Sequence, residues 1–323
     1  MTNPPSATRA PQARPKKTAL EIRVTAGVVH RRPPADGAPP AGAGRTGKRK
    51  AAAPKRRAFT AAGADRHELY QLAVQSPEED CAFYARVYRG LRGKEARHLR
   101  EDFCGTALNS SEWVRRHGRN TAEGFDIDPE PLGWGIEHNF ARLGAEARRA
   151  TLHLKDVRAP SARRPDVRTA TNFSWWIFRE RRDLLEYFRA ACADLKRDGI
   201  FVLDIYGGPD AMLEIQEKRR IDEGFTYIWD QVHYHPTTGD YKAYIHFRFR
   251  DGTELKRAFR YDWRLWSLTE AVDVLRDAGF ASVETYWEGT ADDGDSGNGI
   301  FTKSRKGENC AAWVTYIVAS KLR

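Results

Sequence analysis

Acidic residues at the ends of two predicted strands are the part of the sequence best placed to do chemistry. Glu101 and Asp102 end a short strand and enter a turn before a helix, and Asp126 ends the next strand 25 residues after Glu101. A carboxylate at the end of that second strand can accept hydrogen bonds from the two hydroxyls of a ribose. The spacing therefore predicts a nucleoside-binding site.

The turn after the first strand disfavours a pyrophosphate ligand. A dinucleotide site needs glycines in G-x-G-x-x-G spacing, so that backbone amides can reach the phosphates at a helix N-terminus. Here Gly105 alone remains, and Glu101 and Asp102 crowd the position. Carboxylates attract an ammonium or sulfonium group, while free backbone amides can bind a carboxylate. The turn therefore favours a cationic nucleoside with an amino acid tail.

The run Leu99-Arg100-Glu101-Asp102-Phe103-Cys104-Gly105-Thr106-Ala107 resembles the first motif, V-L-D-x-G-C-G-T-G, of the class I (Rossmann-like) S-adenosylmethionine-dependent methyltransferases. Cys104-Gly105-Thr106 match the motif, and Glu101 falls on its acidic position. Phe103 and Ala107 replace two glycines of the motif. The resemblance implies S-adenosyl-L-methionine as the cofactor.

Two later segments extend the resemblance. Phe125-Asp126-Ile127-Asp128-Pro129 is similar to the second motif, whose Asp binds the ribose, and Leu152 to Val157 is similar to the third strand, which contacts the adenine. The cofactor-binding residues implied are Glu101, Asp102, Cys104, Gly105, Thr106, Asp126, Ile127, Asp156, Val157 and Asn172. Because strand ends line one crevice in a doubly wound sheet, we expect Glu101, Asp126 and Asp156 to converge there. The alternative for each acid alone is a helix cap or a turn residue.

An aromatic segment, Asn172-Phe173-Ser174-Trp175-Trp176, follows the predicted fourth strand, where the family places a loop that faces the substrate. Aromatic rings there can cover a sulfonium methyl group, so Phe173, Trp175 and Trp176 are predicted to bind the acceptor. The alternative is that the tryptophans pack against the sheet. Asn172 and Trp175 also match the ends of the D/N-P-P-Y/F/W motif of DNA amino-group methyltransferases, but both prolines are missing, which disfavours a flipped base.

In-line displacement at the methyl group requires a base wherever the nucleophile carries a proton. The candidates are Tyr206, Asp230, His233 and Asp262, and each has an alternative as a core or sheet-face residue. No metal is expected, because the four cysteines lack C-x-x-C spacing and the close pair His233 and His235 has no identifiable further ligands.

Alternating strands and helices from residue 61 onward predict a doubly wound α/β sheet. Strands are expected at 96–103, 122–126, 151–156, 167–173 and 200–206, and helices at 108–116, 129–143 and around 184–195. An antiparallel β meander is expected as an insertion at about 225–262, followed by a helix at 267–278 and antiparallel C-terminal strands at 282–287 and 312–319. Residues 61–323 would form a single methyltransferase domain.

Residues 1–60 are rich in Pro, Ala and Gly, hold 14 Lys and Arg against 2 Asp and Glu, and are predicted to be a disordered basic tail. Residues 61–323 hold 40 basic against 42 acidic residues, so the sequence pI of about 9.5 comes from the tail. Nonspecific, salt-sensitive contact with polyanions is therefore expected of residues 1–60 alone. Their basic cluster at 48–57 is also similar to a nuclear localisation signal, with a solvated linker as the alternative.

No apolar run approaches the ~18 residues of a membrane span, and the N-terminus lacks an apolar signal core. We expect a soluble cytoplasmic protein, or a nuclear one in a eukaryote, that contacts no membrane; the oligomeric state stays open. The expected function is methyl transfer from S-adenosylmethionine to a small-molecule acceptor. The alternatives are a noncatalytic nucleic-acid-associated protein on a degenerate fold, a nucleic-acid methyltransferase, and an oxidoreductase, which the missing glycines disfavour.

Overall fold

The computed structural model describes residues 20–23, 59–290 and 297–322. Most of the predicted tail, with its basic cluster, lies outside the described residues. Within the tail, however, Leu20–Arg23 form a short strand, β1, which pairs antiparallel with β4. The prediction of a tail without structure is therefore wrong at these four residues.

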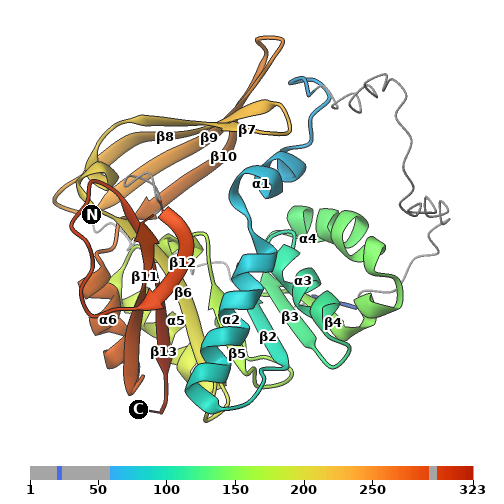
Figure 1. Cartoon of the computed structure of the whole chain (residues 1–323), viewed down its shortest axis with the longest axis vertical. Coiled ribbons are helices and arrows are strands. Elements are labelled where there is room, and N and C mark those ends of the chain that lie inside the picture. The colour runs from blue at the N-terminus through green and yellow to red at the C-terminus, as the bar shows by residue number, and fades with distance from the viewer. Residues whose placement is uncertain (1–19, 24–58, 291–296, 323) are drawn as a thin grey trace, which may run out of the picture.

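A large sheet forms the centre of the molecule and contains nine strands within the described residues (Figure 1). In spatial order these are β1, β4 (Ala150–Leu154), β3 (Thr121–Asp126), β2 (His98–Asp102), β5 (Val167–Ala170), β6 (Ile200–Gly207), β13 (Trp313–Ser320), β11 (Ser282–Thr290) and β12 (Gly297–Lys303). The five strands from β4 to β6 run parallel, and the others pair antiparallel with their neighbours. The predicted Rossmann-like sheet with antiparallel C-terminal strands is confirmed.

Helices cover both faces of this sheet. The helices α2 (Pro77–Arg92) and α3 (Leu108–Arg116) belong to one hydrophobic core, and α5 (Arg181–Asp194) and α6 (Leu268–Asp277) belong to the other. The buried residues Leu184, Phe188 and Ala191 recur at helical spacing along α5, as expected for a helix that packs on a sheet. Between the two layers, the first six residues of β6 are buried, which explains why all of them except Asp204 are apolar.

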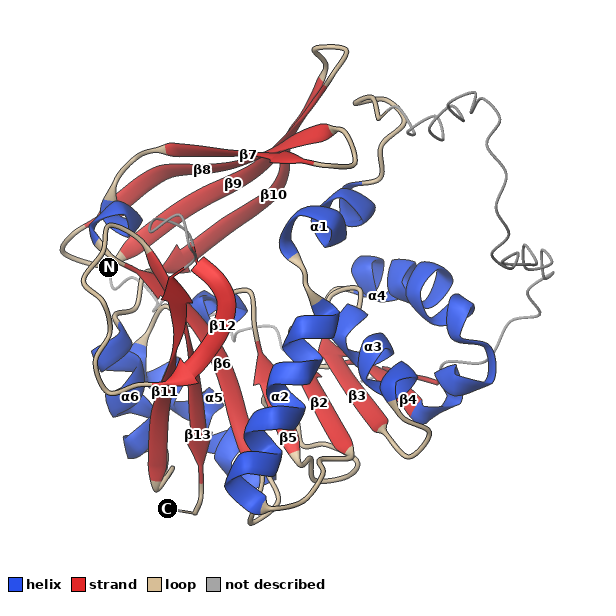
Figure 2. Ribbon diagram, in the orientation of Figure 1, coloured by secondary structure: helices blue, strands red, loops and turns tan. Residues whose placement is uncertain are grey.

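A smaller antiparallel sheet lies across the carboxyl ends of the parallel strands (Figure 2). It has the order β10 (Glu254–Arg264), β9 (Asp240–Phe249), β8 (Phe225–His235) and β7 (Gln216–Ile221). The helix α1 (Arg66–Val74) lies between the two sheets, and its buried residues Leu69 and Ala73 pack against the small sheet. The predicted meander is confirmed but is one strand longer than expected, because β7 precedes it.

The connections between the parallel strands determine where a ligand can bind. The helix α4 (Pro129–Gly135) continues into a π-helical turn at 136–140 and a 3-10 stretch at 141–149. That stretch is interrupted by the non-helical backbone of Gly144 (φ 59°, ψ −125°), directly after the predicted helix end at 143. The chain moves outward from β2 to β4 and then crosses to β5 on the other side of β2. Ligands of doubly wound sheets bind at such a switch point, outside the carboxyl ends of the strands. None of the helices in the described ranges is long and apolar enough to cross a membrane.

Candidate functional site

The turn between β2 and α3 has an unusual backbone. Phe103, Gly105 and Ala107 have φ angles of 53°, 52° and 52°, so they adopt the left-handed conformation in alternation. Phe103 and Ala107 stand where the family motif has glycines, and they nevertheless follow the backbone path that favours glycine. The turn is closed by a hydrogen bond of 2.7 Å from the Ala107 amide to the Cys104 carbonyl. The loss of two glycines therefore leaves the course of the loop intact.

Asp126 binds this turn from the end of β3. Its Oδ2 accepts a hydrogen bond of 2.8 Å from the Gly105 amide, and its Oδ1 accepts one of 3.0 Å from the Asp128 amide. Burial raises the pKa of the Asp126 carboxyl, and hydrogen bonds from the amides of Asp128, Gly105 and Ile127 oppose that rise. Each carboxylate oxygen keeps a free lone pair, so Asp126 can accept further hydrogen bonds from a ligand.

A cavity of about 530 Å³ opens beside this turn, and we call it the turn cavity. Its lining combines the turn, the ends of β3 and β5, α1 and the strand β10. The lining includes Tyr70, Phe103, Cys104, Gly105, Thr106, Asp126, Asn172, Ile177, Tyr261 and Trp263, together with the charged or titratable residues Arg66, His67, Asp128, Glu130, Arg257 and Arg260. Ile127, which follows Asp126, is 64% exposed, an unusual state for an isoleucine. The lining of the turn cavity is thus mainly polar, charged and aromatic, and Ile127 lies outside it.

Glu101 does not take part in the lining of this cavity. Its carboxylate faces α3, where Oε2 accepts hydrogen bonds of 2.8 Å from the Ser110 amide and 2.6 Å from the Ser110 hydroxyl. Burial raises the pKa of Glu101 to about 7, against these hydrogen bonds. The Glu101 side chain therefore holds the first turn of α3 against β2.

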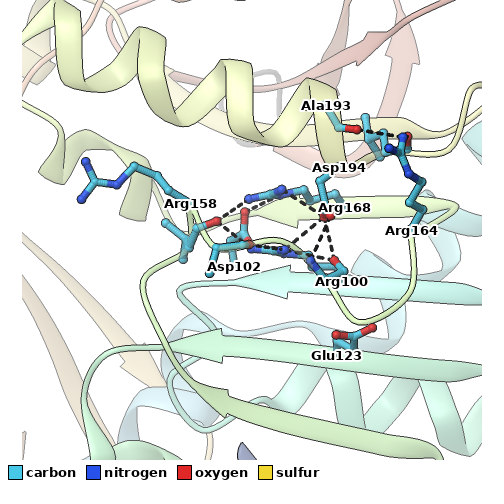
Figure 3. Close-up of polar contacts among 12 residues, drawn as sticks. Arg100, Asp102, Glu123, Arg158, Arg164, Arg168, Ala193 and Asp194 are labelled. Atoms are coloured by element: carbon cyan, nitrogen blue, oxygen red, sulfur yellow. Dashed lines mark hydrogen bonds and ion pairs between the residues drawn. The ribbon is translucent and has the colours of Figure 1, made fainter. Parts of the chain in front are cut away.

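Asp102 points to the opposite face of the sheet, because successive residues of a strand alternate. Figure 3 shows it between Arg100 and Arg168, from which it receives bonds of 2.7 and 2.6 Å, close to Asp194. Tyr187 also donates to Asp102, at 2.7 Å. The expected contact of the Asp102 side chain with a ligand in the turn cavity therefore receives no support from its placement.

The same arginines fix the loop after β4. Arg100 and Arg168 both donate to the carbonyl of Val157, each at 2.6 Å. Asp156 lies outside the lining of the turn cavity, and its pKa is lowered by an ion pair of 2.8 Å with Arg158. The expected convergence of Glu101, Asp126 and Asp156 is wrong: of the three, the turn cavity is lined by Asp126 alone.

A second strained segment lies at the end of β5. Asn172 and Phe173 have φ angles of 57° and 56°, and their amides donate to the carboxylate of Asp204 at 2.7 and 2.9 Å. Burial raises the pKa of Asp204 to about 7. Adjacent left-handed residues persist only where their surroundings hold them, and such strain concentrates at functional sites.

Asn172 belongs to two cavities. Beyond it lies a further cavity of about 380 Å³, the aromatic cavity, between the small sheet and the ends of β6 and β13. It is lined by Tyr70, Phe173, Tyr206, Tyr227, Trp229, Tyr261, Trp263 and Trp313 together with Asn172, Asp210, Glu217, Arg219, Gln231 and Glu288. Tyr70, Asn172, Tyr261 and Trp263 line both cavities. The two cavities therefore adjoin at these residues.

The two tryptophans of the aromatic segment are core residues. Trp175 and Trp176 are fully buried and line neither cavity. The indole of Trp175 donates to the Asp204 carbonyl at 2.9 Å, and Trp176 packs against Tyr206. Their predicted contact with the acceptor is corrected accordingly, whereas Phe173 lines the aromatic cavity. Because the ring of Trp175 is covered, it cannot stack on a flipped base.

Of the four base candidates, Tyr206 alone lines a cavity. Asp230 lies 3.2 Å from His246, Asp262 pairs with Arg260, and His233 is exposed on the small sheet. No group of three or more metal-ligating side chains occurs in the part of the chain that the structure describes.

The contribution of α1 to the site was not predicted from the sequence. Tyr70 lines both cavities, and Gln71 donates to the Thr106 hydroxyl at 2.8 Å. Tyr227, Trp229, Tyr261 and Trp263 of the small sheet line the aromatic cavity. No local motif marks α1, since its part in the site depends on how the chain before the sheet folds back.

Comparisons with known proteins agree with this architecture. No protein-family profile matches the chain, and no curated protein matches it. A solved S-adenosylmethionine-dependent methyltransferase from Clostridium acetobutylicum is 17% identical, with coverage of 79% of this chain and 96% of that chain and a TM-score of 0.56. An amino pentose methyltransferase from Micromonospora echinaspora is 17% identical, with 79% and 95% covered and a TM-score of 0.55. A sugar N-methyltransferase from a Streptoalloteichus species is 16% identical, with 87% and 100% covered and a TM-score of 0.55. The chain thus has the class I methyltransferase fold.

Proposed function

We propose that this protein is a methyltransferase that uses S-adenosylmethionine and acts on a small-molecule acceptor. The observation that carries the proposal is the turn at 103–107: it keeps its left-handed residues without the family's glycines and is bound by Asp126 at the edge of a cavity. A strained turn of this kind needs a reason to persist, and close approach of a ligand to the backbone is one. The fold shared with solved methyltransferases supports the same function.

The residues of the turn cavity fit the cofactor. Asp126 offers oxygens for ribose hydroxyls, and the turn around Gly105 admits a ligand close to the backbone. Ile127, directly after Asp126, is exposed outside the lining of the cavity and offers an apolar surface for a base. When bound, S-adenosylmethionine supplies a methyl group on a sulfonium. The cavity of about 530 Å³ lies within the size range of small-molecule sites.

The chain's own part in the reaction is placement and exclusion of water. Tyr70, Asn172, Tyr261 and Trp263 surround the junction of the two cavities, so they can orient an acceptor in the aromatic cavity toward the turn cavity. Tyrosine and tryptophan faces also attract positive charge, which favours a sulfonium methyl group at this junction. The aromatic cavity of about 380 Å³ matches a small acceptor rather than a macromolecule.

The rival functions fit the site less well. An oxidoreductase would need amides around a pyrophosphate, but Asp126 already occupies the Gly105 amide, and the other two glycines of that pattern are absent. A noncatalytic protein would be favoured if Phe103 closed the turn cavity. Instead its ring packs 5.6 Å from that of Tyr187 and the cavity stays open beside it.

Titration calorimetry of the full chain with S-adenosylmethionine and S-adenosylhomocysteine tests the proposal. We expect micromolar dissociation constants, weakened at least about tenfold by Asp126→Ala, because charge-assisted hydrogen bonds to the ribose and the turn are lost. Asp222→Asn, at an exposed turn of the small sheet, is the matched control and should bind as the parent does. Absence of binding by the folded parent protein, or binding of NADH in place of both ligands, would refute the proposal.

A further inference from the structure

We infer that the acceptor bound in the aromatic cavity is an amine. Its primary or secondary amino group would be attached to an apolar or aromatic skeleton. The inference rests on the proposed function and adds the chemical class of the substrate. It is carried by the arrangement of aromatic rings and carboxylates around the aromatic cavity.

The roof of the aromatic cavity is one face of the small sheet. Glu217 pairs across the strands with Trp229, and Arg219 pairs with Tyr227. Residues two apart on a strand share a face, so these four side chains lie together above the cavity. Trp229 in turn packs 5.5 Å from Tyr261, which continues the aromatic surface to the junction with the turn cavity.

The charge of this lining favours a cation. Asp210, Glu217 and Glu288 contribute carboxylates, against the single guanidinium of Arg219. Within the described residues, the carboxylates of Asp210 and Glu217 have no hydrogen bond or ion pair, whereas Arg219 donates to the Ala73 carbonyl and lies 5.5 Å from the Tyr227 ring. Free carboxylates beside tyrosine and tryptophan faces are the surroundings that stabilise an ammonium ion.

A buried hydroxyl points to a polar group on the ligand. Tyr206 lines the aromatic cavity, and its buried hydroxyl lies beside that of Tyr241, without a well-formed hydrogen bond. Buried polar atoms are nearly always paired, so a ligand group that reaches these two hydroxyls can complete their hydrogen bonding. Burial raises the pKa of Tyr206 well above its ordinary value, so the hydroxyl stays protonated and neutral. Its oxygen can accept a hydrogen bond from an N–H group.

The residues that line the aromatic cavity also suffice for methyl transfer to an amine. A bound ammonium first gives one proton to water or to a lining carboxylate such as Glu217. The nitrogen lone pair then forms the new N–C bond to the methyl group as the C–S bond breaks, and that electron pair stays on sulfur. The product is a methylammonium, which releases a proton to water. A phenol would need a stronger base, yet none of the described lining residues is a histidine or lysine, and the carboxylates would repel a phenolate.

Binding of matched probes to the full chain saturated with S-adenosylhomocysteine tests the inference. The probes are 2-phenylethylamine and tryptamine, their alcohol isosteres 2-phenylethanol and tryptophol, and 3-phenylpropionate. We expect both amines to bind at least about tenfold more tightly than their alcohols, and the propionate most weakly. Glu217→Gln should reduce the amine-over-alcohol preference about threefold to fivefold without changing the affinity for S-adenosylhomocysteine. Glu223→Gln, at the exposed turn after β7, is the control.

The outcomes separate this inference from the proposed function. If S-adenosylhomocysteine binds but the alcohols or the propionate bind as well as the amines, or no probe binds, the amine inference is wrong and the proposed function stands. An amine preference unaffected by Glu217→Gln would place the amines elsewhere and would also overturn it. If the amines bind with the expected preference while neither cofactor form binds, the proposed function is wrong and the aromatic cavity stands as an amine site.

Discussion

At the scale of single residues, Phe103 and Ala107 take the backbone conformation of the glycines that they replace. A left-handed non-glycine residue costs about 1–2 kcal/mol, so the turn stores strain at two positions. At Phe103 the strain is offset by packing, because its ring contacts the rings of Phe178 and Tyr187. Ala107 contributes only a buried methyl group, worth about 0.8 kcal/mol. The strain at Ala107 is therefore barely offset.

Substitution of glycine at Ala107 tests whether this strain is present. Because relief of the strain outweighs the lost methyl group, Ala107→Gly should leave the free energy of unfolding unchanged or raise it by up to about 1 kcal/mol. The matched control is Ala191→Gly, at a buried alanine inside α5, which should lower the free energy of unfolding by about 1 kcal/mol or more. Urea denaturation measures both. Equal destabilisation by the two substitutions would show that Ala107 is not strained.

At the scale of elements, the turn is held from several sides. The side chain of Gln71 on α1 donates to the Thr106 hydroxyl, and the side chain of Asn139, beyond α4, donates to the Thr106 carbonyl, each at 2.8 Å. Gly135 at the end of α4 lies so close to Thr106 that a Cβ atom would collide with its carbonyl. The helix α4 thus sets the position of the turn through a close backbone contact.

Gly135→Ala should displace the turn and weaken S-adenosylhomocysteine binding about tenfold or more, since the added methyl group meets backbone rather than a movable side chain. Gly133 is a matched control in the same helix, because a Cβ atom there would meet nothing within 4 Å. Gly133→Ala should keep the affinity and raise the free energy of unfolding by up to about 1 kcal/mol. Calorimetric titration of both variants with S-adenosylhomocysteine measures the two affinities. An unchanged affinity in Gly135→Ala would show that the position of the turn does not control binding.

The elements also show what the sequence could reveal. Periodic apolar segments were predicted well: the bounds of α3 agree with the expected helix at 108–116, and β6 is only one residue longer than expected. The strands β7 and β12 were missed, because β7 is almost wholly exposed and both are defined by pairing with a neighbour rather than by burial. Motif spacing located the turn and Asp126. It could not tell that Glu101 faces α3 or that Asp102 belongs to a buried arginine cluster, since these directions depend on tertiary contacts.

At the scale of the whole molecule, buried carboxyl groups give the stability a defined pH dependence. Burial raises the pKa of Asp80 to about 6, and those of Glu101 and Asp204 to about 7. The charge of Asp80 contributes to the rise at both other sites. In contrast, hydrogen bonds from His153 and His98 hold the pKa of Glu123 well below its ordinary value. The molecule therefore contains carboxyl groups that favour opposite protonation states.

The carboxyl groups with raised pKa values determine how the stability of the fold changes with pH near neutrality. A folded-state pKa above the unfolded value means that the folded protein retains protons that the unfolded chain releases. This contribution to stability is complete below about pH 4 and is lost as the pH rises through about 6 to 7, where Asp80, Glu101 and Asp204 ionise in the fold. Glu123 acts in the other direction, and its contribution is lost only as the pH falls below its unfolded value.

We therefore expect the unfolding temperature to fall by roughly 5–10 °C between pH 5 and pH 8, as measured by calorimetry. Asp80→Asn should flatten this dependence, because the amide keeps an oxygen for the Tyr316 hydroxyl, which donates to Asp80 at 2.5 Å, but cannot ionise. The variant should match the parent at pH 5 and exceed its unfolding temperature at pH 8. Asp222→Asn, at an exposed turn, should follow the parent throughout. An unfolding temperature that rises from pH 5 to pH 8 would mean that these buried carboxyls are ionised in the fold, with partners strong enough to outweigh their desolvation.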